Sequence, residues 1–429
     1  MNIKQSILGI LLTFFTLGIL QGQNRLVSEA IQAFSEGDYQ KAYEYSGDAL
    51  VNIDELSGDY VAAAWYYLAK SRIQLLRLAM ETGDQEKLLK MQHALIESYI
   101  DYKEALRTAD HQLQQDIEYD LAGLYNPILQ TGLSALNTGN DPEQPENVRL
   151  AALNAAKGYL EAAKDISSTY LAADLLGQVH LALGDSAAAH RLFDESIRSY
   201  QAKPPAEGDF LIAYVVFRKA LIEAYQEKNS GKAIATLVLG ENLLKKEYSR
   251  LSAAGTLKPE KIRKYEKVMR DLIRFELELY IGDDALADDA LVRFREVMLL
   301  YPEDYDIHIA YANLLEKSDP RLAIEEYLTA ISIDESREIA YYNLGALYNN
   351  LGSENYLAGL NANDEQTADS LYNEANKEFR DAYRYMEAAY RLNPYSLETI
   401  RALVQLARSL GLDEQAEMYK EKEFELRGF

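Results

Sequence analysis

The sequence contains no cysteine, and this absence excludes several kinds of chemistry. Without a thiol the chain cannot form a disulfide, use a cysteine nucleophile, bind a metal through thiolates or carry a lipid on a cysteine near its start. Its stability must therefore come from the packing of apolar side chains.

Histidine is scarce, and its spacing does not indicate a metal site. No two histidines lie four residues apart, which is the spacing of a zinc-binding His-Glu-x-x-His motif on a helix. His180 and His190 flank Gly184 and could approach each other, but two imidazoles without a third ligand make a poor site. The other three histidines are His93, His111 and His308. We therefore predict no metal site.

Other catalytic patterns are also missing. The chain has no Gly-rich phosphate-binding loop. Gly184-Asp185-Ser186 lacks the pattern of a nucleophile elbow and is explained by helix capping. Carboxylates are so numerous that chance pairs carry no information. We predict no catalytic residue, no cofactor and no enzymatic activity.

Strand signals are absent, and proline is rare. Nine prolines interrupt 429 residues, and no stretch alternates polar and apolar residues as a half-buried strand does. The abundant Ala, Leu, Glu and Lys favour helix. A single globular domain of this length would be unusually large, whereas a repeat protein simply adds units. The composition therefore predicts an all-α fold.

A long apolar run occurs only at the start of the chain. Lys4 precedes the run Ile7–Leu20, and the small residue Gly22 follows it, which is the layout of a secretory signal peptide. A retained membrane anchor and a buried helix are the alternatives, but 14 helical residues span only about 21 Å of a roughly 30 Å hydrocarbon core. We expect residues 1–23 to be a signal peptide cut after Gly22 or Gln23. The protein would then be exported to the periplasm, the cell envelope or the exterior, with no other membrane span.

The net charge of −24 restricts the partners. Such a surface repels nucleic acid phosphates and anionic lipid headgroups. It favours basic partners, although it fits equally well a solvated surface that resists aggregation, because acidic residues occur in every part of the chain.

A spacing of small residues and turn residues recurs along the chain. In its clearest copy, Gly177 is followed by Gly184-Asp185 and then by Ala189 and Phe193. Related copies contain Ala30, Gly37, Asp38, Ala42 and Ala49; Gly345, Tyr348 and Gly352; and Ala407, Gly411 and Ala416. Such self-similarity indicates a solenoid, in which each unit buries its apolar face by stacking on its neighbours.

The spacing predicts a helix-turn-helix unit. Gly37, Gly184 and Gly352 fall where a helix must end, and glycine adopts the left-handed conformation there at little cost. Asp38 and Asp185 can then cap the following helix.

Small residues such as Gly177 and Gly345 would lie where two helices approach closely. Phe193, Phe294 and Tyr327 would fill the space beside such positions. Pro302 and Pro394 would separate one unit from the next, because proline stops a helix.

These residues resemble the tetratricopeptide repeat (TPR), a 34-residue antiparallel helix pair. Besides the copy at 176–193, the resemblance includes the pair formed by Leu344-Gly345 and Ala382, Met386 and Pro394. It implies a right-handed superhelical solenoid of about nine antiparallel helix pairs from residue 24 onward. We assign residues 24–203 and 204–429 to two repeat regions. The first departs from the pattern in a long-helix unit at 57–109 and a loop insertion at 137–147.

The resemblance also implies where a partner would bind, because the first helix of each pair faces the concave surface. The residues that this register places in the groove are Arg218, Ile222, Tyr225 and Gln226; Tyr305, His308 and Glu316; Tyr342, Asn349 and Asn350; and Glu398, Arg401, Gln405 and Arg408. Their aromatic, amide and guanidinium groups suit an extended peptide. The carboxylate clamp of the family's chaperone-binding members is missing, because Tyr342, Ala346 and Glu398 occupy its positions.

An insertion of about 25 residues, 353–376, interrupts the repeat between Gly352 and Ala382. The turn at 361–364 and a cap at Asp364 predict two extended helices that project as a hairpin. Such an insertion is often a binding device, although a tolerated loop extension explains it too.

Three functional hypotheses follow. We expect an exported scaffold or adaptor that binds a protein or peptide. The alternative is a glycan-binding surface protein similar to the helical-repeat components of sugar-uptake systems, which the 32 tyrosines favour and the missing lipidated cysteine disfavours. An enzyme with a diffuse active site fits least well.

Overall fold

The computed structural model describes residues 22–206 and 208–427, and within these ranges every regular element is a helix. The fold class is therefore all-α, as predicted. The chain divides into two compact units between Gly208 and Asp209, close to the predicted boundary at 203/204. The expected signal peptide falls almost entirely on residues 1–21, which lie outside the described residues. No helix among the described residues is long and apolar enough to cross a membrane.

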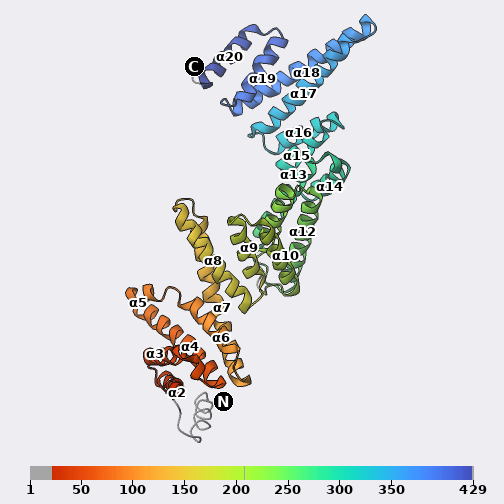
Figure 1. Ribbon diagram of the computed structural model, residues 1–429. Helices are drawn as coiled ribbons and strands as arrows, with labels where there is room; N and C mark the ends of the chain where they lie inside the picture. Colours follow the sequence, from red (N-terminus) through yellow and green to blue (C-terminus); the bar gives the residue numbers. More distant parts are fainter. Residues whose placement is uncertain (1–21, 207, 428–429) are drawn as a thin grey trace. The chain divides into compact units, whose positions relative to one another are not determined.

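The first unit consists of four consecutive helix pairs (Figure 1). Its helices are α2 (Gly22–Ser35), α3 (Tyr39–Val51), α4 (Gly58–Thr82), α5 (Gln85–Lys90), α6 (Ala94–Leu106), α7 (His111–Asn140), α8 (Glu146–Ile166), α9 (Tyr170–Ala182) and α10 (Ser186–Ala202). The 25-residue α4 is the long helix expected in 57–109, and it pairs with α6. The loop expected at 137–147 is shorter, since only residues 141–145 separate α7 from α8.

The second unit adds five pairs, so the described residues contain nine, in agreement with the expected number of about nine. Its helices are α11 (Ile212–Leu221), the π-helical turn η2 (Ile222–Gln226), α12 (Ser230–Ala253), α13 (Pro259–Ile281), α14 (Ala287–Leu300), α15 (Tyr305–Leu315), α16 (Pro320–Ile333), α17 (Glu338–Leu360), α18 (Glu365–Leu392), α19 (Leu397–Ser409) and α20 (Asp413–Arg427). Each helix packs mainly on its neighbours in sequence, so each pair is a local unit, as in other repeat solenoids.

Two of the predicted turns are formed as expected. Gly37 and Gly184 have φ angles of 82° and 83°, which only glycine adopts at little cost. Asp38 then accepts a hydrogen bond from the Lys41 amide, and Asp185 accepts one from the Ala188 amide. Pro302 and Pro394 lie in the connections before α15 and α19.

Close helix approach explains the small residues. A Cβ atom added to Gly177 on α9 would lie 2.6 Å from Cε1 of Phe193 on α10, a distance at which carbon atoms clash. Phe193 and Ala189 are fully buried. The missing side chain at Gly177 therefore makes the space that the Phe193 ring fills.

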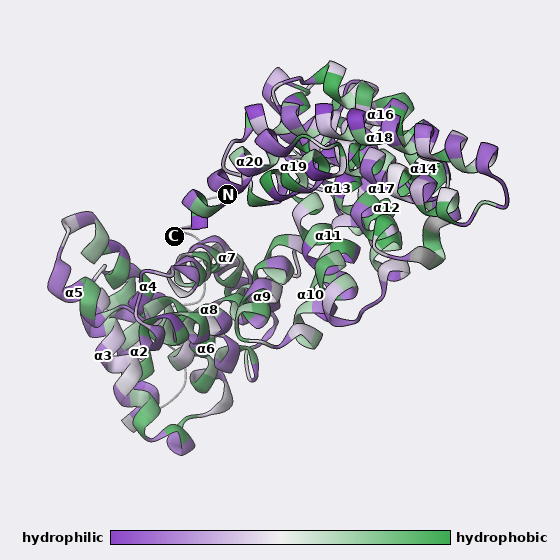
Figure 2. Ribbon diagram, turned by 90° about the horizontal axis from the view of Figure 1, so that it is seen from above, coloured by the Kyte–Doolittle hydropathy of each residue, from purple (hydrophilic) through white to green (hydrophobic). Residues whose placement is uncertain are grey.

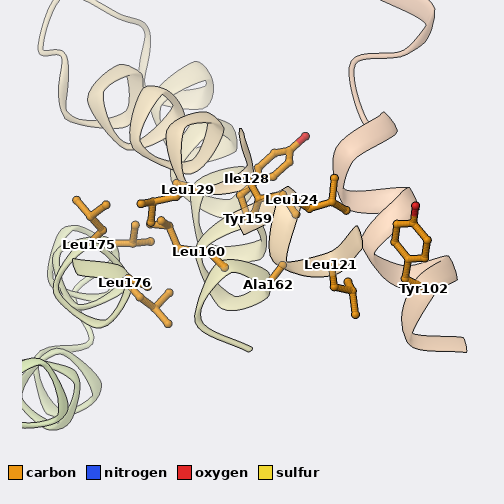
Figure 3. Close-up of a cluster of buried hydrophobic side chains, with 14 of the residues drawn as sticks. Tyr102, Leu121, Leu124, Ile128, Leu129, Tyr159, Leu160, Ala162, Leu175 and Leu176 are labelled. Carbon is orange, nitrogen blue, oxygen red and sulfur yellow. The ribbon is translucent and has the colours of Figure 1, made fainter. Parts of the chain in front are cut away.

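One apolar cluster runs through α4 and α6–α9 of the first unit, and a separate, smaller cluster lies between α2, α3 and α4. Figure 3 shows Tyr102 of α6, Leu121 and Ile128 of α7, Leu160 of α8 and Leu176 of α9 in one apolar cluster. In Figure 2 the helices carry polar residues on one side and apolar residues on the other. Each pair thus covers the apolar face of the next, as expected from the repeat pattern.

Gly352 does not end a helix, contrary to the sequence prediction. It lies inside α17, which continues to Leu360. A Cβ at Gly345, Gly352 or Gly359 would lie 2.7–2.9 Å from a side-chain atom of α18. The facing residues are Met386, Phe379 and Tyr372, in that order. Both series repeat every seven residues, or about two helical turns, so these three layers form one continuous glycine seam.

The seam extends the α17–α18 pair into the predicted hairpin. The two helices have 23 and 28 residues, and Figure 1 shows them side by side, projecting past α16. Asp364 accepts a hydrogen bond from the Thr367 amide at 2.8 Å and so caps α18 as expected.

Candidate functional site

Three predicted site residues lie on α17. Tyr342 and Asn349 are seven residues apart and therefore share a helix face; both are half-buried, whereas Asn350 is exposed. Tyr342 packs against the apolar cluster of α18, α19 and α20 that contains Ile400. Its ring therefore supports the fold, and Asn350 is the exposed side chain among the three.

Arg401, Gln405 and Arg408 form an exposed row on α19, because their spacing of four and three residues follows the helical period. Arg401 Nε donates to Glu423 Oε1 of α20 at 2.8 Å, and Arg408 Nη2 lies 3.9 Å from Glu417 Oε1. The hydrogen bond from Arg401 lowers the pKa of Glu423. Glu423 of α20 thus holds the Arg401 guanidinium at the surface beside α19, whereas Glu417 is bound by Lys420 at 2.9 Å and only approached by Arg408.

Tyr305 and His308 are not groove residues, contrary to the prediction. Both are buried at the start of α15, with 5% of their surface exposed. The Tyr305 hydroxyl accepts a hydrogen bond from the Ala340 amide at 2.9 Å. The His308 ring lies between Glu326 Oε2 and the Pro302 carbonyl oxygen, at 2.6 and 3.0 Å. These contacts tie α15 to the neighbouring helices and leave neither side chain open to a partner.

Arg218 and Tyr225 belong to the first pair of the second unit, three pairs before α17–α18 along the chain. Arg218 is half-buried, and Tyr225 is exposed on η2 with its ring stacked on Phe275 at 6.2 Å between centroids. Ile222, predicted in the same groove, is buried. The structure therefore does not join this group to the residues of α17 and α19.

A row of polar side chains that the sequence reading left out connects α15 to α17. Asn343 Nδ2 donates to Asn313 Oδ1 at 3.2 Å. The Tyr327 hydroxyl of α16 lies against Asn313 and 2.6 Å from Glu316 Oε1. The two asparagines lie on the first helices of consecutive pairs but at different positions, the ninth residue of α15 and the sixth of α17, so the repeat pattern gave no signal for this contact.

An arginine cluster also escaped the sequence reading. Arg270 and Arg274 of α13 and Arg337 before α17 surround Asp304 and Asp306 at the start of α15. The Arg274 guanidinium lies 3.1 Å from Asp304 and 2.6 Å from Asp306. Arg337 lies over the Tyr305 ring at 3.9 Å, a cation–π arrangement that fixes its orientation.

A buried ionic group links α12, α13 and α14. Arg293 of α14 donates to Glu276 at 2.8 Å and also contacts Glu241, and both carboxylates are almost fully buried. Burial raises the pKa of Glu276 to about 7; the hydrogen bond from Arg293 opposes this shift, and Glu241 adds to it. This group is enclosed, so it contributes to stability rather than to binding.

Each histidine beside Gly184 has a carboxylate of its own nearby. His180 Nδ1 lies 3.3 Å from Asp185, and His190 Nδ1 lies 3.6 Å from Asp194. Within residues 22–206 and 208–427, no group of three or more His, Cys, Asp or Glu side chains is arranged to hold a metal ion.

Comparisons with known proteins give distant structural likenesses only. No protein-family model and no curated protein matches the chain. The assembly chaperone of RpL4 (Acl4) is 15% identical, with 68% of this chain and 99% of that chain covered and a TM-score of 0.42. A TPR repeats protein from Bacteroides fragilis is 16% identical, with 65% and 98% covered and a TM-score of 0.29. Yeast Tom70 is 15% identical, with 94% and 92% covered and a TM-score of 0.26. Within each unit, the described residues form consecutive helix pairs in which glycines such as Gly177 and Gly345 face large side chains, a fold of the tetratricopeptide-repeat type.

Proposed function

We propose that this protein is a non-enzymatic scaffold or adaptor that binds a protein or peptide through the second unit. The binding surface is the exposed part of α17 and α19, formed by Asn349, Asn350, Arg401, Gln405 and Arg408, which we call the α17–α19 face. TPR-type folds generally present such first-helix surfaces to peptides.

The observation that carries this proposal is the chemistry of the exposed side chains. Amide groups can donate to and accept from a peptide backbone, and arginine is enriched among the residues that contribute most to protein interfaces. Arg401 is already oriented by its hydrogen bond to Glu423. Holding a side chain in place before binding lowers the entropic cost of the complex.

The α17–α18 hairpin is a second support for this location. Tyr356, Leu357 and Leu360 are exposed on its projecting part, each with about half of its surface accessible. Exposed apolar side chains beside a polar face are typical of interaction sites. We infer that the hairpin extends the α17–α19 face rather than serving only as a spacer.

Export is part of the proposal. The motivation is Lys4 and the apolar run Ile7–Leu20, which are typical of a signal peptide. We expect the secreted form to begin at Gln23 or Asn24 and the partner to lie in the periplasm or cell envelope. N-terminal sequencing of the protein from cells decides this, because an intact Met1 on a membrane-embedded protein would instead support an anchor.

The charge of the partner follows from the surface as a whole. With 68 acidic and 44 basic residues, most of the chain attracts cations and repels polyanions. We therefore propose a partner that is basic over most of its surface. Measuring the association rate against ionic strength tests this, because a neutral partner would show little salt dependence.

Site-specific photocrosslinking in cells tests the binding surface. A photoreactive residue at Asn350 or Gln405 should capture a defined protein, since both positions are exposed. The same residue at Arg295, which is exposed on α14, is the matched control. Equal capture from all three positions, or capture from Arg295 alone, would contradict the proposed face.

The glycan-binding alternative depends on exposed aromatic rings. The exposed tyrosines are Tyr119, Tyr214, Tyr225, Tyr356 and Tyr395. Tyr225 is the best placed of these, because Phe275 stacks on its ring. Binding on a glycan array that is lost in Tyr225→Ala would favour this second function over the first.

A further inference from the structure

One stretch of the second unit reverses the charge balance of the chain. Residues 245–274 contain ten Lys or Arg and four Asp or Glu, although acidic residues outnumber basic ones in the whole sequence. The stretch covers the end of α12, the following loop and most of α13. A local excess of positive charge on an acidic protein attracts a different kind of ligand from the rest of the surface.

Four of these basic residues form a row on α13. Arg263, Lys267, Arg270 and Arg274 are separated by four, three and four residues, and at about 100° per residue they lie within roughly 60° of one another on the helix. Arg263, Lys267 and Arg270 are exposed, and Arg274 is half-exposed. We call this row the basic stripe; eleven residues of helix make it about 16 Å long.

The two ends of the basic stripe differ in their partners. Arg270 and Arg274 are paired with Asp304 and Asp306 of α15. For Arg263 and Lys267, the described part of the chain shows no ion pair within 4.0 Å. The stripe therefore has a fixed end, where carboxylates orient the guanidinium groups, and an open end that can bind additional negative charge.

Aromatic rings further order the fixed end. The Arg270 guanidinium lies 5.8 Å from the centre of the Tyr301 ring, and Arg337 continues the row beyond Arg274 over Tyr305. An ordered guanidinium presents its N–H groups as a fork that matches the two oxygens of a carboxylate.

We propose that the basic stripe binds an acidic segment of a protein partner. The length of the stripe favours this ligand over RNA or an anionic membrane. Those polyanions extend well beyond 16 Å, and acidic residues predominate in the chain as a whole. Acidic side chains that come within the Debye length of about 8 Å at physiological salt would repel them. A peptide segment with three or four carboxylates contacts the stripe alone. The inference rests on the proposed scaffold function, to which it adds the chemistry of one docking segment.

The test uses the full chain and a defined probe. A fluorescein-labelled helical peptide with glutamate at the i, i+4, i+7 and i+11 positions is titrated by fluorescence anisotropy, and a peptide with lysine at the same positions is the control. We expect only the glutamate peptide to bind, with an affinity that falls as salt is raised. Oligouridine RNA and phosphatidylserine vesicles are then added as competitors.

Two matched variants assign the binding to the stripe. Arg263→Glu/Lys267→Glu should weaken peptide binding about tenfold or more, because the substitutions remove the open end of the stripe and break no ion pair seen among the described residues. Arg380→Glu/Arg391→Glu makes the same change in net charge at exposed positions of α18 and should change the affinity less than about twofold. Far-ultraviolet circular dichroism checks folding, and Arg263→Gln/Lys267→Gln replaces the first variant if it misfolds.

Several results would overturn the inference. These are failure of the glutamate peptide to bind, equal losses in the two charge-reversal variants, or tighter stripe-dependent binding of the RNA or the vesicles. Failure of the scaffold function is separately visible, because photocrosslinking from Asn350 and Gln405 does not involve the stripe. If a partner is captured there and the stripe variant still binds that partner fully, only the inference about the stripe fails.

Discussion

The α9–α10 and α17–α18 pairs use the same packing device to different extents. In α9–α10, one close glycine, Gly177, faces one large ring, Phe193, and the left-handed Gly184 ends the first helix seven residues later. In α17–α18, Gly345 occupies the corresponding place, but Gly352 and Gly359 repeat the contact instead of forming the turn.

The difference shows what sets the length of a helix pair. A glycine seven residues after the first has two possible roles. It can adopt a positive φ and end the helix, or it can remain helical and pack against another large side chain of the facing helix. Gly352 does the latter because Phe379 lies in the facing helix to fill the space. Each added layer lengthens the pair by about two turns, and two added layers produce the hairpin.

The largest expected effect comes from removing the ring that faces the single close glycine of the α9–α10 pair. Phe193→Ala should lower the free energy of unfolding by about 3–5 kcal/mol, since the ring is fully buried and its removal leaves a cavity. Phe379→Ala should cost less, because Phe379 is only half-buried. Urea unfolding of both variants measures the difference. Equal losses would show that the two seams contribute alike.

Adding a side chain at a glycine of the α17–α18 seam should have the next largest effect on stability. Gly352→Val should destabilise the protein by about 1–3 kcal/mol through overpacking against Phe379. Gly158→Ala on α8 is the control, because a Cβ there meets nothing within 4 Å. It should stabilise the helix by up to about 1 kcal/mol. The seam explanation fails if both substitutions change the melting temperature in the same direction.

The contribution of the buried Glu276 to the free energy of unfolding should depend on pH, whereas the contribution of the apolar glycine contacts should not. Burial raises the pKa of Glu276 to about 7 from its ordinary value of 4.5, against the opposing hydrogen bond from Arg293. Between these values the folded state keeps a proton that the unfolded state releases, so this contribution to stability is lost as pH rises. Compared with Glu276→Gln, the wild type should therefore be relatively more stable at pH 5 than at pH 8. Urea titrations at the two pH values check this, and parallel curves for the two proteins would refute it.

Deleting the projecting layer should have the smallest effect on the fold. Removing residues 353–376 and inserting a short Gly-Ser link eliminates the Gly359–Tyr372 contact and leaves those of Gly345 and Gly352. Unfolding of the remaining pairs should change by less than about 1 kcal/mol, because their stacking contacts lie outside the hairpin. Loss of cooperative unfolding in circular dichroism would show instead that the hairpin supports its neighbours.

The local rules of the repeat could be predicted from the sequence, whereas its side-chain register could be predicted only in part. Gly184, Asp185 and Gly177 act as expected because turn, cap and close-contact chemistry depend on neighbouring residues. The burial of Tyr305 and His308 was missed because it depends on Ala340, Pro302 and Glu326, which come from other segments.

Two other features were visible in the sequence but had competing interpretations. The seven-residue spacing of Gly345, Gly352 and Gly359 indicates a seam once the matching spacing in α18 is considered. The basic stripe follows the helical period in residues 263–274, but the net charge of −24 directed attention to basic partners.

Binding by the α17–α19 face is tested most directly by the affinity of a captured partner for the Arg401→Ala/Arg408→Ala variant. Truncation of interface arginines often costs about 2 kcal/mol or more, so the double variant should bind at least about 30-fold more weakly while keeping the wild-type melting profile. Arg380→Ala/Arg391→Ala, with the same loss of charge on α18, should bind as tightly as wild type. Unchanged affinity in the first variant, or equal loss in both, would contradict the proposed binding face.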